Sequence, residues 1–340
     1  MKVMLVKLSS LGDVVHTFPA LTEAMRFVPE LRVDWLIEDA YVPIARLHPA
    51  VGEVVPVHWR AARRSLGGAA TELRRLWGEL RTRRYDLVLD AQGLIKSALP
   101  SAVVPARRRV GLSAQSVRER AAAALYRERI HVPREKHAIE RVRSLFAAAF
   151  GYSLAPVWTY GIEATPASRT DQVVLLHGTT WANKAWPESS WTELARRAIA
   201  EGLAVTLPWG SADEQSRAMR IAERAPGTTV APALALDALA ALLRSARGVV
   251  SVDSGLGHLA AAVGAPVVGL YGPTDPARTG LRGARVVSLA SNFPCAPCLE
   301  RRCVYRGPVV VDGGEAIAPP CFSRLPPARV WAALHKLALS

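Results

Sequence analysis

Long apolar runs are absent from this sequence of 340 residues. No stretch approaches the roughly 20 consecutive apolar residues that a membrane-spanning helix needs. At the start, Lys7 and Asp13 interrupt the short apolar run of residues 3–6, which is not typical of an export signal. We therefore expect a cytoplasmic protein without a transmembrane segment, long enough for two ordinary domains.

Two motifs are also missing. No GxGxxG follows the first strand of either half, which argues against a dinucleotide-dependent dehydrogenase. No DxD pair is present that would hold a divalent metal against a diphosphate. The sequence therefore predicts a site that works without a metal or another cofactor, in which side chains and helix ends balance any phosphate charge.

Cysteine is scarce and confined to one late segment. Cys295 and Cys298 form a CxxC pair, but no second CxxC completes a zinc ribbon with Cys303 and Cys321. In a reducing cytoplasm we expect free thiols or a local structural knot. Structural zinc is the alternative.

Positive charge prevails over negative charge. The chain has 43 Lys and Arg against 29 Asp and Glu, a formal net charge of +14. Such an excess favours anionic partners such as a nucleic acid, an anionic membrane or a phosphorylated glycolipid. The basic zones lack interleaved aromatic residues and carry no nucleic-acid-binding motif. We expect no nucleic-acid partner, and a non-enzymatic nucleic-acid binder is a remote alternative.

The basic residues gather in the first half, where we predict an anion-facing surface. They are mostly Arg, whose planar fork suits bidentate contact with phosphate or carboxylate. A solvated helix face is the alternative for any one of them. A second basic zone extends from Arg107 through Arg118, Arg120 and Lys136 to Arg143. The first zone, opposed locally only by Glu72 and Glu79, contains Arg60, Arg63, Arg64, Arg74, Arg75, Arg81, Arg83 and Arg84.

Apolar runs alternate with amphipathic stretches along the whole chain, which predicts an α/β fold. A strand at residues 3–7 precedes a helix on which Val14, Phe18, Leu21 and Met25 recur at helical spacing. In the second half we expect strands at residues 173–176, 204–207, 249–252 and 267–271, joined by helices and forming a parallel sheet. Residues 152–169 form the natural linker.

The alternation gives three segments. We expect one α/β domain at residues 1–160, a second α/β domain at 170–325 and a C-terminal helix at 326–340 that packs toward the first domain. Two such α/β domains would face a central cleft. Because open α/β sheets bind ligands beyond the carboxyl ends of their strands, residues that follow strands are the candidates for function.

Asp13 is the candidate base of the first half, because it opens a helix after the first strand. A carboxylate there can remove a proton from an acceptor hydroxyl. The alternative is a simple N-cap, in which Asp13 only accepts backbone N–H bonds.

In the second half, four loops after strands carry polar groups, one of them at residues 272–275. His177, Thr179, Thr180 and Lys184 supply the hydroxyls, amides and ammonium that hold a diphosphate. After the strand that ends at Val252, a helix N-terminus offers free amides to an anion and would stabilise a departing nucleotide. Glu214 follows another strand and could accept hydrogen bonds from ribose hydroxyls.

Several motifs together resemble the ADP-heptose:lipopolysaccharide heptosyltransferases, and most closely those that add the first heptose to Kdo-lipid A. The resemblance covers nearly the whole chain and rests on seven segments. They are KLSSLGDVVHTFPAL, DAQGLIKSA, HAIERVR, HGTTWANKAWPE, LPWGSADE, VSVDSGLGHL and YGPTDP.

The resemblance implies a GT-B fold of two Rossmann-like domains and an inverting, metal-independent transfer from ADP-L-glycero-D-manno-heptose. The acceptor would be the Kdo of Kdo-lipid A at the cytoplasmic face of the inner membrane. Asp13 and Lys184 would be catalytic. Residues 170–325 would be the nucleotide-sugar-binding domain, where the donor would meet Thr179, Thr180, Lys184, Glu214, Asp253, Ser254, Gly255 and His258. Residues 1–160 would be the acceptor-binding domain, where the acceptor would meet Lys7, Ser10, Arg60, Arg63, Arg64 and Arg118. A second-heptose transferase, or another sugar-nucleotide transferase on the same fold, is the alternative.

Overall fold

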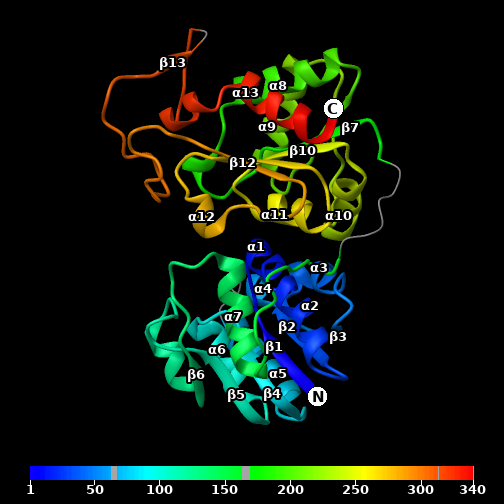
Figure 1. Ribbon diagram of the computed structural model, residues 1–340, viewed down its shortest axis with the longest axis vertical. Helices are drawn as coiled ribbons and strands as arrows, with labels where there is room; N and C mark the ends of the chain where they lie inside the picture. Colours follow the sequence, from blue (N-terminus) through cyan, green and yellow to red (C-terminus); the bar gives the residue numbers. More distant parts are fainter. Residues whose placement is uncertain (63–66, 163–168, 313, 340) are drawn as a thin grey trace. The chain divides into compact units, whose positions relative to one another are not determined.

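The computed structural model describes residues 1–340 except 63–66, 163–168, 313 and 340. Its contacts divide the chain into two compact units, Met1–Ile162 and Glu163–Ser340. In Figure 1 the first unit is coloured from blue to green and the second from green to red. Each unit contains one six-stranded parallel sheet with helices packed on it.

The strands of the first sheet are β1 (Lys2–Val6), β2 (Arg32–Glu38), β3 (Val51–Val57), β4 (Tyr85–Asp90), β5 (Ala106–Leu112) and β6 (Glu128–Ile130). Their order in the sheet is β3-β2-β1-β4-β5-β6. The helices of this unit are α1 (Leu11–Val15), α2 (Phe18–Phe27), α3 (Val42–Ala45), α4 (Trp59–Ala62), α5 (Gly68–Leu80), α6 (Ile95–Val103) and α7 (Ala138–Phe150).

The second sheet contains β7 (Gln172–Leu176), β8 (Ala204–Leu207), β9 (Thr228–Val230), β10 (Gly248–Val252), β11 (Val267–Tyr271) and β12 (Val286–Ala290). Its order, β12-β11-β10-β7-β8-β9, has the same topology as the first sheet. The helices are α8 (Glu188–Ala200), α9 (Ala212–Arg224), α10 (Leu236–Ser245), α11 (Gly255–Ala262), α12 (Pro276–Thr279) and α13 (Pro327–Leu334). β13 (Val311–Asp312) and β14 (Glu315–Ala316) form a small antiparallel pair.

Burial explains why the central strands are uniformly apolar. All five residues of β10 are buried, as are residues 3–6 of β1, because helices cover both faces of a parallel sheet. Each unit has its own apolar core. One core includes Met4, Leu36 and Val88, and the other includes Trp186 and Trp191.

The first helix differs from the sequence prediction. The apolar positions from Val14 to Met25 predict one helix, but the structure has α1 and α2, separated at His16 and Thr17. Pro19 lies in the first turn of α2, where its missing N–H is tolerated, whereas it would break a continuous helix. Met25 is 43% exposed and lies outside the apolar face.

The C-terminal helix α13, drawn in red, packs against α8 and the second sheet (Figure 1). Val330 and Leu334 are fully buried in the core of that unit. The expectation that this helix also packs toward the first domain stays a prediction. Among the described residues, no helix combines the length and apolar composition that crossing a membrane requires.

Candidate functional site

The strand order of each sheet reverses at one point, and the loops that carry Asp13, Lys184 and Asp253 begin there. In the first sheet the reversal lies between β1 and β4, and in the second between β7 and β10. Loops leave such a pair of strands in opposite directions, which opens a crevice at their carboxyl ends. We call these places the first and the second switch point.

At the first switch point Lys7 joins the two neighbouring strands. Its Nζ donates to the carbonyl oxygen of Ala91 at 3.0 Å and lies 3.2 Å from Oδ1 of Asp13. Only 5% of Lys7 is exposed. The ammonium is therefore held in one place, directly against the carboxylate.

Asp13 is not the N-cap of its helix. That position belongs to Ser10, and the carboxylate of Asp13 reaches back to accept from the backbone N–H of Ser10 at 3.1 Å and from its hydroxyl at 3.2 Å. Desolvation in the pocket tends to raise the pKa of Asp13, but the charge of Lys7 and the Ser10 hydrogen bonds lower it below its ordinary value. The side chain is nevertheless 43% exposed. It is an accessible carboxylate that is ionised at neutral pH.

A pocket of about 190 Å³ lies beside this carboxylate, entirely within the first unit. Asp13, Lys7 and the exposed Arg118 line it. Arg141 lines it too, although the sequence reasoning gave it no role. Its guanidinium donates to the carbonyl oxygen of Ser116 at 2.7 Å. In the sequence, Arg141 lies in the motif HAIERVR and within the second basic zone.

Gln92 and Asp90 fix the loop that precedes Asp13, and neither was predicted to do so. Oε1 of Gln92 accepts from the backbone N–H groups of Leu8 and Ser9 at 3.0 and 3.2 Å. The fully buried Asp90 accepts from the N–H of Gln92 at 2.8 Å and from the hydroxyl of Tyr126 at 2.8 Å. Burial raises the pKa of Asp90. Residues of the motif DAQGLIKSA therefore support the loop that precedes Asp13.

At the second switch point another Lys and Asp form an ion pair between the loops that follow the two neighbouring strands. Nζ of Lys184, in the loop after β7, lies 2.7 Å from Oδ2 of Asp253, which follows β10. Both side chains are largely buried. The ammonium also lies 4.4 Å from the ring centroid of Trp181, an attraction to the electron-rich face of the indole. Lys184 and Asp253 are distant in the sequence but form one ion pair in the structure.

Other predicted donor-side residues lie in the loop after β7 or at the start of α11. Thr179 and Thr180 follow β7 and are at least partly exposed. Ser254 is the N-cap of α11, Gly255 begins that helix, and His258 is buried in its first turns. The free amides of the α11 N-terminus therefore lie directly after Asp253, in the position that favours an anion.

Glu214 lies against the loop that carries the two threonines. It belongs to the first turn of α9, and its Oε2 accepts from the N–H of Gly210 at 2.7 Å. A Cβ atom on Gly178 would collide with the Glu214 carboxylate, so glycine permits the close approach. His177 is buried, and burial, followed by the charge of Arg217, lowers its pKa to about 4. It is therefore neutral at pH 7 and is no phosphate-binding cation.

Comparison with known proteins decides the family. The family model described as glycosyltransferase family 9 (heptosyltransferase) matches residues 73–308. The chain belongs to this family. Lipopolysaccharide heptosyltransferase 1 of Pseudomonas aeruginosa is 44% identical, with 100% of this chain and 99% of the relative covered. The protein of the same name from Escherichia coli K12 is 38% identical, with 82% of this chain and 90% of the relative covered.

A solved structure agrees. The chain resembles E. coli heptosyltransferase WaaC with ADP-2-deoxy-2-fluoro heptose at 34% identity and a TM-score of 0.80, with 99% of each chain covered. Together with the two parallel sheets, this similarity confirms the predicted α/β fold of GT-B type. Membership also confirms that the protein is a glycosyltransferase.

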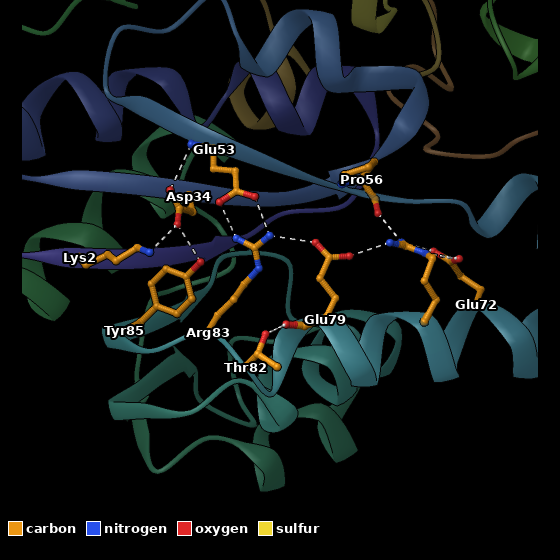
Figure 2. Close-up of polar contacts among 10 residues, drawn as sticks. Lys2, Asp34, Glu53, Pro56, Glu72, Glu79, Thr82, Arg83 and Tyr85 are labelled. Atoms are coloured by element: carbon orange, nitrogen blue, oxygen red, sulfur yellow. Dashed lines mark hydrogen bonds and ion pairs between the residues drawn. The ribbon is translucent and has the colours of Figure 1, made fainter.

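The predicted anion-facing surface of this family 9 member is only partly available to a ligand. Arg83 donates two hydrogen bonds to Glu53, each at 2.6 Å, and a third to Glu79 at 2.9 Å (Figure 2). Arg75 is bound to Glu72 and to Glu79, both at 2.7 Å. The prediction was therefore wrong for Arg75, which is paired with two acids of its own helix, and for Arg83, because β3 brings Glu53 to it.

The other predicted residues of the first unit differ in their burial and in whether the structure describes them. Arg143 is buried and is bound to Glu23, so it does not face a ligand. Ser10 is exposed beside Asp13. Arg60 lies in α4, whereas Arg63 and Arg64 lie outside the described residues.

All four cysteines are free thiols, and all four line one apolar pocket of about 300 Å³ in the second unit. Burial raises the pKa of Cys321 to about 12, and burial also raises that of Cys295. Among the described residues, no three His, Cys, Asp or Glu side chains are placed so as to bind a metal ion.

Proposed function

We propose that this protein transfers heptose from ADP-L-glycero-D-manno-heptose to the Kdo of Kdo-lipid A, in lipopolysaccharide inner-core synthesis. The observation that carries the proposal is the 44% identity, over the full chain, to an enzyme named lipopolysaccharide heptosyltransferase 1. The two switch points supply the chemistry that such a transfer needs. One offers an ionised carboxylate in a basic pocket, and the other offers a cation and a helix N-terminus for a diphosphate.

In the proposed reaction, the acceptor hydroxyl attacks the anomeric carbon of heptose from the face opposite to ADP. The new C–O bond forms as the bond to the phosphate oxygen breaks, and ADP leaves with the bonding electrons. Asp13 takes the hydroxyl proton, since an alcohol is a poor nucleophile at neutral pH. The single displacement inverts the anomeric configuration.

The second unit would bind the donor. We assign Thr179, Thr180 and Lys184 to the diphosphate, with Ser254, Gly255 and His258 around it. Glu214 would accept from the ribose hydroxyls and Asp253 from the heptose hydroxyls. Negative charge develops on ADP as it leaves, and Lys184 together with the amides of α11 would stabilise it. With this cation and these amides in place, the transfer would proceed without a metal ion.

The first unit would bind the acceptor. Arg118 and Ser10 are accessible beside Asp13 and suit the carboxylates and phosphates of Kdo-lipid A. We add Arg60, Arg63 and Arg64 to this surface as predictions from the sequence. Lys7 faces the same pocket and also sets the charge of Asp13. The net charge of +14 would hold the enzyme at the cytoplasmic face of an anionic inner membrane.

The test is to incubate the purified protein with ADP-heptose and Kdo-lipid A, with and without EDTA. The molecular mass of the glycolipid is then measured by mass spectrometry. We expect addition of one heptose under both conditions. Nuclear magnetic resonance of the product should show an anomeric configuration opposite to that of the donor. If only an acceptor that already carries one heptose reacts, the protein is a second-heptose transferase.

A further inference from the structure

The segment of residues 298–301, which begins at the second cysteine of the CxxC pair, is fastened to the carboxyl edge of the second sheet. The N–H of Leu299 donates to the carbonyl oxygen of Pro273 at 2.8 Å, just after β11. Nδ2 of Asn183, in the loop after β7, donates to the carbonyl oxygen of Glu300 at 3.0 Å. Because β11 and β7 flank β10, the segment links the loops on either side of the strand that ends before Asp253.

These two hydrogen bonds restrict the backbone immediately before Arg301. Asn183 is 2% exposed, so its bond to Glu300 is shielded from water, and its Nδ2 also lies 3.6 Å from Sγ of Cys298. Arg301 comes next in the chain. Its guanidinium carbon lies 5.4 Å from the ring centroid of Trp181. Lys184 contacts the same indole ring. One aromatic side chain therefore holds two cations.

The two cations differ in how much charge they can offer to a ligand. The charge of Lys184 is opposed by Asp253 at 2.7 Å. Within the described part of the chain, by contrast, no carboxylate lies within ion-pair distance of Arg301, which is exposed. A nucleotide diphosphate brings two negative charges, and the sequence has no DxD pair to recruit a metal against them. A second protein cation beside Lys184 would supply the missing positive charge.

We propose that Arg301 binds the diphosphate of the nucleotide-sugar together with Lys184. The proposal rests on the donor site described above and adds a residue to it from the cysteine-containing segment. The planar guanidinium can offer two parallel N–H donors to phosphate oxygens while its face stays against Trp181. In this way the segment takes part in substrate binding, and its cysteines lie close to the donor loop through Asn183.

The experiment compares Arg301→Ala with Arg302→Ala, a matched control that removes a neighbouring charge that is also exposed. Titration calorimetry with ADP measures affinity, and steady-state kinetics measure KM for ADP-heptose and for the acceptor. We expect Arg301→Ala to weaken ADP binding about 10- to 100-fold, as loss of a charge-assisted hydrogen bond does. KM for ADP-heptose should rise with it, while KM for the acceptor stays unchanged. Arg302→Ala should stay within about twofold of the wild type.

A third variant, Arg301→Lys, keeps the charge without the fork and should bind ADP with intermediate affinity. Thermal melting of each variant checks that the fold is intact. The proposal is overturned if Arg301→Ala binds ADP as tightly as the wild type, or if both alanine variants lose affinity equally. A wild-type protein that does not bind ADP would instead overturn the donor site itself, and Arg301 with it.

Discussion

Asp13 shows how a residue can be both part of a helix start and available for chemistry. Its carboxylate accepts from Ser10 and faces Lys7, yet almost half of the side chain remains exposed. The sequence could predict a carboxylate at this strand end, because the apolar run and the helical spacing locate the loop. It could not show that Ser10 is the cap or that Lys7 points at Asp13, since both depend on how the loop folds.

Replacing Asp13 by Asn tests its proposed role as the base. The amide oxygen can still accept from Ser10, but the residue can no longer take a proton. We expect kcat to fall by a factor equivalent to about 3–5 kcal/mol of transition-state stabilisation, with melting temperature and ADP affinity close to those of the wild type. A folded variant that keeps a normal kcat would show that the carboxylate acts only in capping.

Replacing Lys7 by Met tests what sets the charge of Asp13. Desolvation tends to raise the pKa of Asp13 and Lys7 opposes it, so removal of the ammonium should raise this pKa. The acid limb of the profile of kcat against pH should therefore move to higher pH. Lys2→Met is the control, because Lys2 pairs with Asp34 and not with Asp13. An acid limb at the same pH in both variants would contradict the assignment.

At the scale of elements, α2 and α7 are joined by a buried ion pair. Arg143 on α7 is 3% exposed and donates to both carboxylate oxygens of Glu23 on α2, at 2.6 and 2.7 Å. The sequence analysis placed Arg143 in a basic zone that could face an anion. Its partner is 120 residues away, so only the packing of the two helices reveals it.

Arg143→Met should destabilise the protein by about 3–5 kcal/mol, because it leaves Glu23 buried without its partner. Urea unfolding followed by circular dichroism measures the loss. Adding Glu23→Leu to the Arg143→Met variant removes the unpaired buried carboxylate and should recover much of the lost stability. The matched control is Arg108→Met, which removes a half-exposed pair with Glu128 and should cost about 1 kcal/mol or less. Equal losses in the two single variants would contradict this reasoning.

At the scale of the whole molecule, the alternation of apolar and amphipathic stretches predicted two α/β units. It could not give the order of the strands, because neighbours such as β10 and β7 are joined by long-range pairing and not by sequence. For the same reason the sequence located polar loops after the strands but not the pairing of Lys184 with Asp253. The switch points explain why those particular loops meet.

Acid should lower the free energy of unfolding of both units, because each unit contains a buried histidine that is neutral in the folded state. Burial lowers the pKa of His48 and of His177 to about 4, from an ordinary value of 6.5. In each case the unfolded chain takes up a proton at a higher pH than the folded chain. Each buried histidine therefore makes its full contribution to the free energy of unfolding above pH 6.5, where it is neutral in both states. This contribution is lost as the pH falls toward 4. At pH 5 the loss is on the order of 2 kcal/mol per histidine.

Urea unfolding of the wild type and of His48→Gln at pH 7 and pH 5 measures this effect. The difference between the two pH values should shrink in His48→Gln. It should stay unchanged in His131→Gln, because His131 is exposed. The same pH dependence in all three proteins would exclude His48 as a source of acid sensitivity.

The shared strand order of the two sheets has a consequence for how specificity can change. Each unit has its own core and its own switch point, so neither needs the other's residues to form its crevice. Under the proposed assignment of the acceptor to the first unit and the donor to the second, a chimera joined after Ile162 should keep the donor of one parent and take the acceptor of the other. Recombination near the midpoint of the chain would then exchange one substrate without changing the other.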